Sequence, residues 1–186
     1  MKLFAKLALA SFLAVLAGCV PALNPLYTEK DEIFDSALLG VWAKLESKET
    51  WAFTKRDGRE YHLLYTEEDG RKSEFIVHLL KIEGEMFLDL YAMKAANLQD
   101  NDYLLPLHTF MLVLEIDPKP QFSYLDPGWL KHYLEKNPTA IQHEHINDEI
   151  LLTGSTPELQ EFLLTHLKTK GAFSEPTNLK RQERGL

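Results

Sequence analysis

Between residues 38 and 125, short apolar runs alternate with polar turns in a pattern that predicts a series of β-strands. The runs cover residues 38–46, 49–55, 59–66, 71–82, 86–92, 105–116 and 121–125. Several connections are short and contain an Asp-Gly or Glu-Gly pair, and such turns are typical of antiparallel hairpins. A polar loop is expected at 97–102. The pattern therefore predicts a mainly β fold, built as an antiparallel meander.

The runs 71–82 and 105–116 are apolar on both faces. In the first run, Phe75 and Val77 share one face, while Ile76 lies on the other. A strand that is buried on both faces requires a cover outside the sheet or side chains that fill the inside of a barrel. We therefore expect the meander to close into a barrel and other elements to cover part of its wall.

Two amphipathic helices are predicted, at about 127–136 and 157–168. The first begins after Asp126 as N-cap, and the second is capped by Thr156 or by a capping box that starts at Ser155. Apolar residues recur along the second helix at helical spacing, and they are Leu159, Phe162, Leu163, His166 and Leu167. We expect both helices to pack on the barrel.

The first nineteen residues have the pattern of a secretory signal. Lys2 and Lys6 precede an apolar run at 7–16, which ends in Leu16-Ala17-Gly18-Cys19. This ending resembles the lipobox of bacterial lipoproteins, and the resemblance implies cleavage before Cys19 and acylation of that residue. The alternatives are an uncleaved membrane helix, for which the run is shorter than the roughly 20 residues required, and a secreted protein without a lipid.

The lipoprotein resemblance implies a division of the chain into four parts. They are a signal peptide at 1–18, a lipidated tether at 19–37, a single β-barrel domain with two helices at 38–170, and a polar tail at 171–186. It also implies a location in the cell envelope, anchored to a membrane by acyl chains. Val20 follows the cysteine where the family commonly has Asp for inner-membrane retention, which implies the periplasmic face of the outer membrane in a two-membrane cell.

Charge narrows the range of partners. The whole chain has 20 Lys and Arg against 28 Asp and Glu. Loss of Lys2 and Lys6 with the signal peptide leaves 18 against 28, a formal charge of −10. Such an acidic chain is not expected to bind nucleic acid. Cys19 is the only cysteine, so no disulfide can stabilise the domain.

Gly40-Val41-Trp42, at the start of the first strand of the meander, resembles the first motif of lipocalins and other calycins. The resemblance implies an eight-stranded barrel in which Gly40 and Trp42 form a structural plug at one end, covered by a late arginine such as Arg181. The helix at 127–136 departs from the lipocalin order of elements. The head of the chain, from Asn24-Pro25-Leu26-Tyr27 to this motif, is similar to a type of small bacterial lipoprotein without an assigned activity.

Two functions remain open. Six aromatic residues could line a barrel cavity for a small apolar ligand or lipid, namely Trp51, Phe53, Tyr61, Tyr65, Phe75 and Phe110. If these residues are core instead, the barrel is filled. The protein would then be an envelope interaction, adaptor or inhibitor protein that binds a protein partner with an exposed patch, for which Trp129 and Tyr133 are available.

Catalytic and metal-binding patterns are weak, so we expect neither an enzyme nor a cofactor. Ser155 is explained by helix capping. His143 and His145 share one face of a strand and could bind a metal with His108 as a third ligand, but an exposed strand face is the simpler interpretation and no metal is expected. His62 and His78 are interpreted as isolated side chains with satisfied hydrogen bonds.

Overall fold

The structure is a computed structural model that describes residues 19–93 and 107–182. Its strands are β1 (Pro21–Ala22), β2 (Glu32–Ile33), β3 (Gly40–Lys44), β4 (Thr50–Lys55), β5 (Tyr61–Thr66), β6 (Lys72–Ile82), β7 (Glu85–Ala92), β8 (His108–Glu115), β9 (Gln121–Tyr124), β10 (His143–Ile146), β11 (Glu149–Leu152) and β12 (Thr177–Arg181). Its helices are α2 (Pro127–Lys136) and α3 (Thr156–His166). The signal peptide and the polar loop expected at 97–102 lie outside the described residues.

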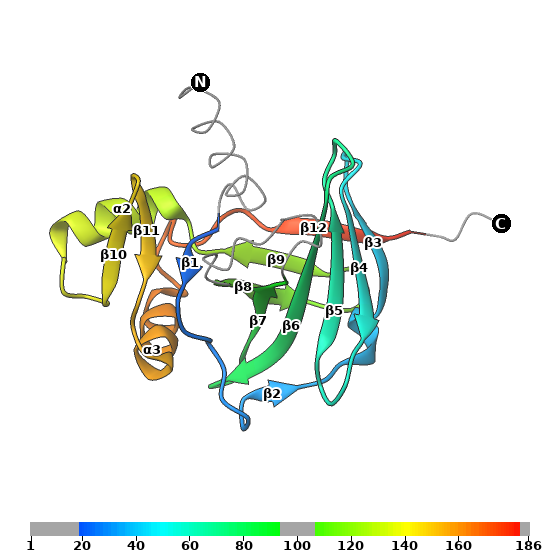
Figure 1. The fold of residues 1–186 in the computed structure, drawn as a ribbon, viewed down its shortest axis with the longest axis horizontal. Helices are drawn as coiled ribbons and strands as arrows, with labels where there is room; N and C mark the ends of the chain where they lie inside the picture. Colours follow the sequence, from blue (N-terminus) through cyan, green and yellow to red (C-terminus); the bar gives the residue numbers. More distant parts are fainter. Residues whose placement is uncertain (1–18, 94–106, 183–186) are drawn as a thin grey trace, which may run out of the picture.

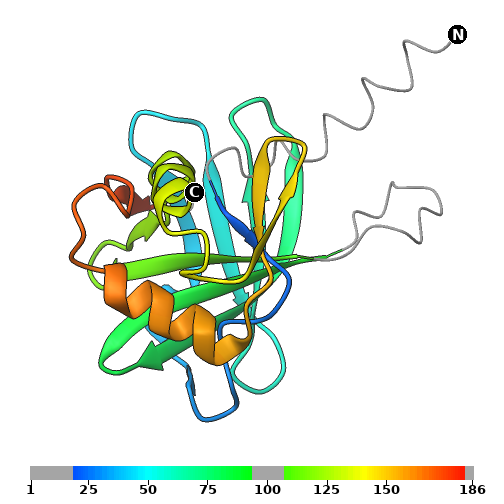
Figure 2. The same ribbon diagram turned by 90° about the vertical axis from the view of Figure 1, so that its left-hand side faces the viewer.

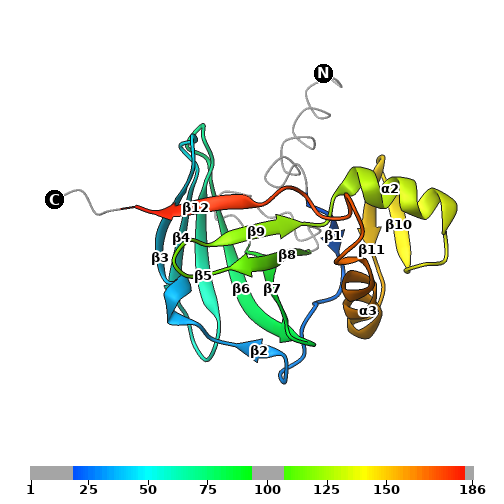
Figure 3. The ribbon, with the colours of Figure 1, turned by 180° about the vertical axis from the view of Figure 1, so that it is seen from behind.

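Eight of these strands form a closed antiparallel barrel (Figures 1 and 3). The neighbours run in the order β8-β7-β6-β5-β4-β3-β12-β9, and β9 pairs again with β8 to close the ring. Strands β10, β11 and β1 continue the sheet outside the ring from β8, and β2 pairs with β6. The predicted fold class, a closed antiparallel barrel with two helices packed on it, is confirmed.

The inner face of the barrel carries one of two hydrophobic cores, here called the interior cluster. Alternation along each strand directs every second side chain inward, and all eight barrel strands contribute. Its buried members are Leu38, Trp42, Trp51, Phe53, Tyr61, Leu63, Phe75, Val77, Leu79, Leu88, Leu90, Met111, Val113, Ile116, Phe122 and Leu179.

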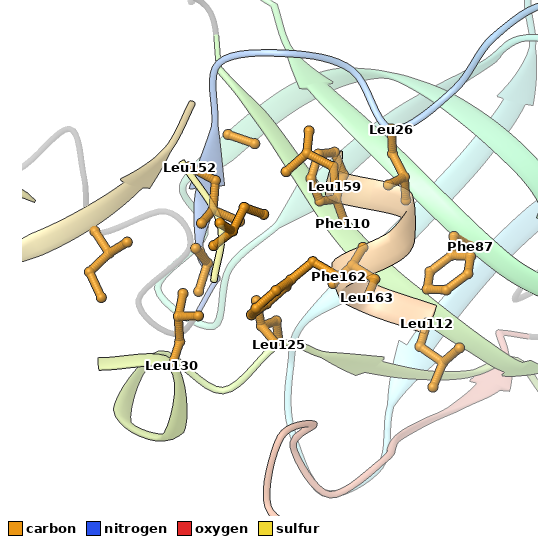
Figure 4. Packing of buried hydrophobic residues seen from close by; sticks show 14 of the residues in the cluster. Leu26, Phe87, Phe110, Leu112, Leu125, Leu130, Leu152, Leu159, Phe162 and Leu163 are labelled. Atoms are coloured by element: carbon orange, nitrogen blue, oxygen red, sulfur yellow. The ribbon is translucent and has the colours of Figure 1, made fainter. Parts of the chain in front are cut away.

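The second core, the outer cluster, lies between the outer face of β6–β8 and the helices. Figure 2 shows α3 lying across the barrel strands, and Figure 4 shows its apolar side chains directed toward the wall. Leu80, Phe87 and Leu112 come from the wall and pack with Leu159 and Phe162 of α3. Strands β6, β7 and β8 are therefore buried on both faces, because one face lines the barrel and the other supports the helices. This burial was predicted for β6 and β8.

Both helices are capped at their N-termini by the side chains that the sequence predicts. The Asp126 carboxylate accepts a hydrogen bond from the Trp129 amide at 2.7 Å, and Ser155 donates its amide to Glu158 Oε2 at 2.7 Å. The range 127–136 predicted for the first helix matches α2, whereas α3 ends two residues earlier than the predicted 168. These side chains satisfy amides that have no partner within the helix.

Two segments differ from the expected domain boundaries. The segment 19–37, expected as a tether, pairs with the sheet through β1 and β2, and Leu26 within it is fully buried. The segment 171–186, expected as a polar tail, contains β12, which closes the barrel between β3 and β9. β1 and β2 have two residues each, and β12 has five with one buried apolar residue, so none of them shows a periodicity from which a strand can be predicted. They form because their pairing satisfies backbone groups at sheet edges that would otherwise be open.

Four aromatic side chains gather where α2 meets α3. The His166 ring lies within 5.0 Å, centroid to centroid, of the rings of Trp129, Tyr133 and Phe162. Trp129 and Tyr133 stack on each other and are half-buried, so they are docked on the domain with part of their surface exposed. Burial lowers the pKa of His166, because the charged imidazolium is desolvated there.

We predict that His166 makes the protein less stable in mild acid. Its pKa is lower in the folded state than the 6.5 of an unperturbed histidine. The unfolded chain therefore binds the proton first, and the free energy of unfolding should fall as the pH drops below about 6.5. Urea unfolding between pH 7.5 and 5 should show that the free energy of unfolding falls less steeply with decreasing pH for His166→Phe than for the wild type. His132→Phe, at an exposed position of α2, should parallel the wild type; equal slopes for all three proteins would contradict the prediction.

Candidate functional site

Four of the six aromatic residues predicted to line a cavity lie in the interior cluster, namely Trp51, Phe53, Tyr61 and Phe75, and a fifth, Tyr65, packs against it. Their rings pack against one another, with centroids 5.1 Å apart for Trp51 and Tyr65 and 6.4 Å apart for Phe53 and Tyr61. In the part of the chain that the structure describes, two pockets of about 290 and 230 Å³ both lie outside the barrel wall, and neither is lined by residues of the interior cluster. The interior thus has the character of a packed core.

The sixth residue, Phe110, is not part of this group. On β8 the inward positions belong to Met111 and Val113, so Phe110 projects outward into the outer cluster, as Figure 4 shows. The prediction of Phe110 as a cavity residue was wrong. Strand 105–116 is apolar on both faces, so its composition cannot decide which alternate set points inward, and a shift by one residue exchanges the two sets.

Gly40, Trp42 and Arg181, which the calycin resemblance groups as a plug, lie together in the structure. Trp42 is buried and donates its Nε1 to the Leu38 carbonyl at 2.8 Å. The Arg181 guanidinium lies over the indole, 4.3 Å from the ring centroid, and its Nη1 donates to the Leu39 carbonyl. Gly40 has φ of +134°, and a Cβ there would approach Arg181 Nη1 to 2.6 Å. The positive φ therefore favours glycine, and any Cβ here would push the Arg181 guanidinium aside.

Cys19 lies directly on the barrel. It packs against the interior cluster, and burial raises the pKa of its thiol to about 12. Tyr65 is a neighbour: its pKa is raised mainly by burial, then by Glu49 and Glu67, with a smaller contribution from Cys19. A group attached to Cys19 would start at the barrel surface, without a flexible spacer between it and the fold.

The histidines considered as metal ligands do not converge. His143 and His145 are neighbours on β10, with ring centroids 5.3 Å apart, and His143 Nδ1 is bonded to the Ile141 carbonyl oxygen at 2.9 Å. His108, the suggested third ligand, is engaged with Asp89 on the barrel wall. Among residues 19–93 and 107–182, no group of three His, Cys, Asp or Glu side chains is placed to hold a metal ion.

A polar site that the sequence did not predict lies on the outer wall of the barrel. We call it the outer-wall pocket; it has a volume of about 230 Å³ and is lined by Pro25, Tyr27, Glu60, Ile76, His78, Tyr91 and His108. Strand register brings these residues together, because Ile76 pairs with Tyr91, and Tyr91 pairs with His108 across the next strand. His78 occupies the adjacent row, opposite Asp89. The segment that contains Pro25 and Tyr27 crosses over this part of the wall.

Asp89 organises the pocket although it is fully buried. One oxygen is 2.7 Å from His108 Nδ1, and the other accepts the Leu26 amide at 2.7 Å. The first contact places a proton on Nδ1 of His108 and leaves Nε2 as the remaining ring nitrogen. The second contact holds the segment before Tyr27 against the wall. A single carboxylate thus fixes both sides of the pocket.

His78 is the second buried histidine of the pocket, and it is incompletely bonded. Its ring stacks on Tyr27 with centroids 3.9 Å apart. Its Nδ1 lies 3.4 Å from Glu32 Oε1, but the alignment is too poor for a hydrogen bond, so this buried nitrogen has no partner. The interpretation of His78 as a satisfied side chain was therefore wrong, whereas His62 does contact Glu74, with 2.7 Å between Nε2 and Oε2.

The carboxylates around the outer-wall pocket make the electrostatic potential there negative. Burial raises the pKa of Tyr27 to about 12, and the next largest contributions come from the carboxylates of Asp89, Glu32 and Glu60. The positive groups nearby are engaged at the rim: Arg56 Nε is 3.3 Å from Glu60 Oε2, and Arg59 donates to the Glu32 carbonyl. The only sequence signals for this site were the two polar residues, His78 and Asp89, that interrupt apolar runs on neighbouring strands.

Comparison of the chain with models of known protein families, with curated proteins and with solved structures gave no match in any of the three. The function must therefore be inferred from the geometry. In the described part of the chain, neither helix has the length and apolar character needed to cross a membrane.

We predict that Gly40→Ala destabilises the protein by about 1–3 kcal/mol, because the new methyl group is strained at positive φ and displaces Arg181 from Trp42. Arg181→Ala should cost about 0.5–1 kcal/mol, the usual value of an exposed cation–π contact. The double variant should be more stable than the sum of the single effects implies, since both changes disturb the same contact. Denaturant unfolding of the four proteins gives the coupling energy; strict additivity would show that Arg181 and Gly40 act separately.

Proposed function

We propose that the protein is a lipid-anchored envelope protein that acts through its outer surface, as an interaction protein built on a filled barrel. The observation that carries this proposal is the interior cluster. Buried side chains from all eight strands occupy the inside of the barrel, and the aromatic rings contact one another. A small-ligand cavity of the usual size, about 300 Å³ or more, would need that space.

The proposed location follows from the N-terminus. The lipobox-like sequence ends at Cys19, and the residues that follow are fixed to the fold at once, since Pro21 and Ala22 pair with Thr109 and His108. Several acyl chains would give stable attachment to a membrane. The domain would then be held close to that membrane. We place it at the periplasmic face of the outer membrane in a two-membrane cell.

The half-buried pair Trp129 and Tyr133 on α2 is the proposed contact surface for a protein partner. Aromatic side chains that are partly docked and partly exposed are enriched at interfaces, because they contribute large areas at low entropy cost. The stacked rings are held in place from below by Phe162 and His166. Their orientation is therefore set before any partner binds.

One observation favours a second function, an apolar ligand inside the barrel. The Trp51 Nε1 atom is buried in the interior cluster without a hydrogen-bond partner. A buried indole normally finds an acceptor, and a bound molecule with a polar end could supply one. The two functions are distinguished by whether the purified protein carries such a molecule.

We expect native mass spectrometry of the full protein, extracted from the envelope in a neutral maltoside detergent, to show no reproducible non-covalent apolar molecule. In-cell photo-crosslinking from position 133 should give a discrete adduct with an envelope protein, and the same probe at exposed Lys136 should give less of it. A bound molecule of constant mass that is lost in Trp51→Phe would support the internal ligand and contradict the filled barrel.

Lipid attachment is tested separately. Cells that express the wild-type protein and are fed an alkyne-tagged fatty acid should yield a labelled protein in the membrane fraction, because Cys19 accepts the acyl chains. Cys19→Ala should abolish the label, whereas Ser36→Ala, at an exposed position of the following segment, should retain it. An unlabelled wild type, or a Cys19→Ala protein that is still labelled, would refute the anchor.

A further inference from the structure

We propose that the outer-wall pocket binds a small organic cation of the ammonium class. The inference does not depend on the lipid anchor or on the partner of α2. Two features favour this ligand: the carboxylates of Glu60 in the lining and of Glu32 and Asp89 close behind it, and the two tyrosines, Tyr27 and Tyr91, among the lining residues.

The charges favour a cation. Glu60 lines the pocket, the fully buried Asp89 stands behind His108, and Glu32 lies 3.4 Å from the ring of His78. Arg56 pairs with Glu60 at 3.3 Å, so one of these three carboxylates is partly neutralised. The histidines contribute hydrogen-bonding nitrogens to the wall. An anion in this place would meet the carboxylates at short range, where repulsion is only partly screened by solvent.

The shape and the aromatic rings favour an organic ammonium over a bare metal ion. Tyr27 and Tyr91 both line the pocket, and tyrosine faces attract ammonium groups by about 0.5–2 kcal/mol. One face of Tyr27 is stacked on His78, which leaves the other face for a ligand. Ile76 adds an apolar side chain to the lining that suits methyl or methylene groups. The volume of about 230 Å³ is below the range of drug-sized ligands, so the ligand is small. In the described residues no three metal-ligating side chains converge.

The side chain of His78 adds a polar group to the wall of the pocket. The side chain is 5 % exposed, and its Nδ1 has no hydrogen-bond partner. This nitrogen lies 3.4 Å from Glu32 Oε1 and is shielded from solvent, while the His78 side chain as a whole lines the pocket. A ligand with a hydroxyl group beside its charge would suit a wall made of tyrosine and histidine side chains. Hydroxyalkyl ammonium compounds combine these features.

The test compares choline with 3,3-dimethylbutan-1-ol, which has nearly the same shape but no charge, and with acetate as an anion. The full protein is extracted in a neutral maltoside detergent and carries ¹³C-labelled isoleucine methyl groups. Ile76 reports from the pocket, and Ile116, buried in the interior cluster, is the internal control. We expect choline to shift the Ile76 methyl signal with a Kd of roughly 10 mM or lower. This Kd should be at least about tenfold lower than the Kd of the alcohol. The Ile116 signal should stay unchanged.

The charge dependence is tested with two matched variants. Glu60 forms an ion pair with Arg56, and Glu67 forms an ion pair with Arg71; in both pairs the two residues are four positions apart. Removing the charge of either glutamate therefore breaks one similar ion pair. Glu60→Gln should weaken choline binding about three- to tenfold, and Glu67→Gln, which lies away from the pocket, should leave it unchanged. Equal binding of choline and the alcohol, tighter binding of acetate, no shift of Ile76 at high choline concentration, or equal effects of the two variants would each overturn the proposal.

Discussion

The buried carboxylate of Asp89 connects the wall of the barrel to the N-terminal segment that crosses it. An ionised carboxylate without partners would cost several kcal/mol in such a place. Here one oxygen is bonded to the His108 ring and the other to the Leu26 amide, both at 2.7 Å. Charge-assisted hydrogen bonds of this length offset the desolvation. Because one bond goes to the wall and one to the N-terminal segment, the segment cannot leave without removing the partner of one of the two carboxylate oxygens.

A second acidic residue and α3 complete this attachment. Asp31 is buried, which by itself raises its pKa, but hydrogen bonds from Thr28 and Gln160 outweigh burial and the pKa is lowered. Gln160 also donates to the Leu26 carbonyl at 2.8 Å, and Thr156 donates to the Pro25 carbonyl at 2.7 Å. The segment is therefore held between the wall and the first turns of α3. The outer-wall pocket is the space left where this cover does not reach the strands.

The sequence predicted those features that depend on residues close together in the chain. The hairpin turns, the two-sided burial of β6 and β8, and the range of α2 all follow from periodicity and capping within about a dozen residues. The roles of β1, β2 and β12 could not be predicted, since their pairing partners lie up to 139 residues away in β3, β6, β8, β9 and β11. The outer-wall pocket combines Tyr27, His78 and His108, and only strand register shows that these residues meet.

The same register explains why the interior and exterior of the barrel have different chemistry. On β7, Leu88 and Leu90 point inward to the interior cluster, while the alternate residues Asp89 and Tyr91 point outward, Asp89 to His108 and Tyr91 to the pocket. A slip by one residue would bury Asp89 inside the barrel, among aromatic rings without a hydrogen-bond partner. The polar residues on this strand therefore fix its register as firmly as the apolar ones do. A wall that is apolar inside and locally polar outside can keep a packed core and still present a binding site on its surface.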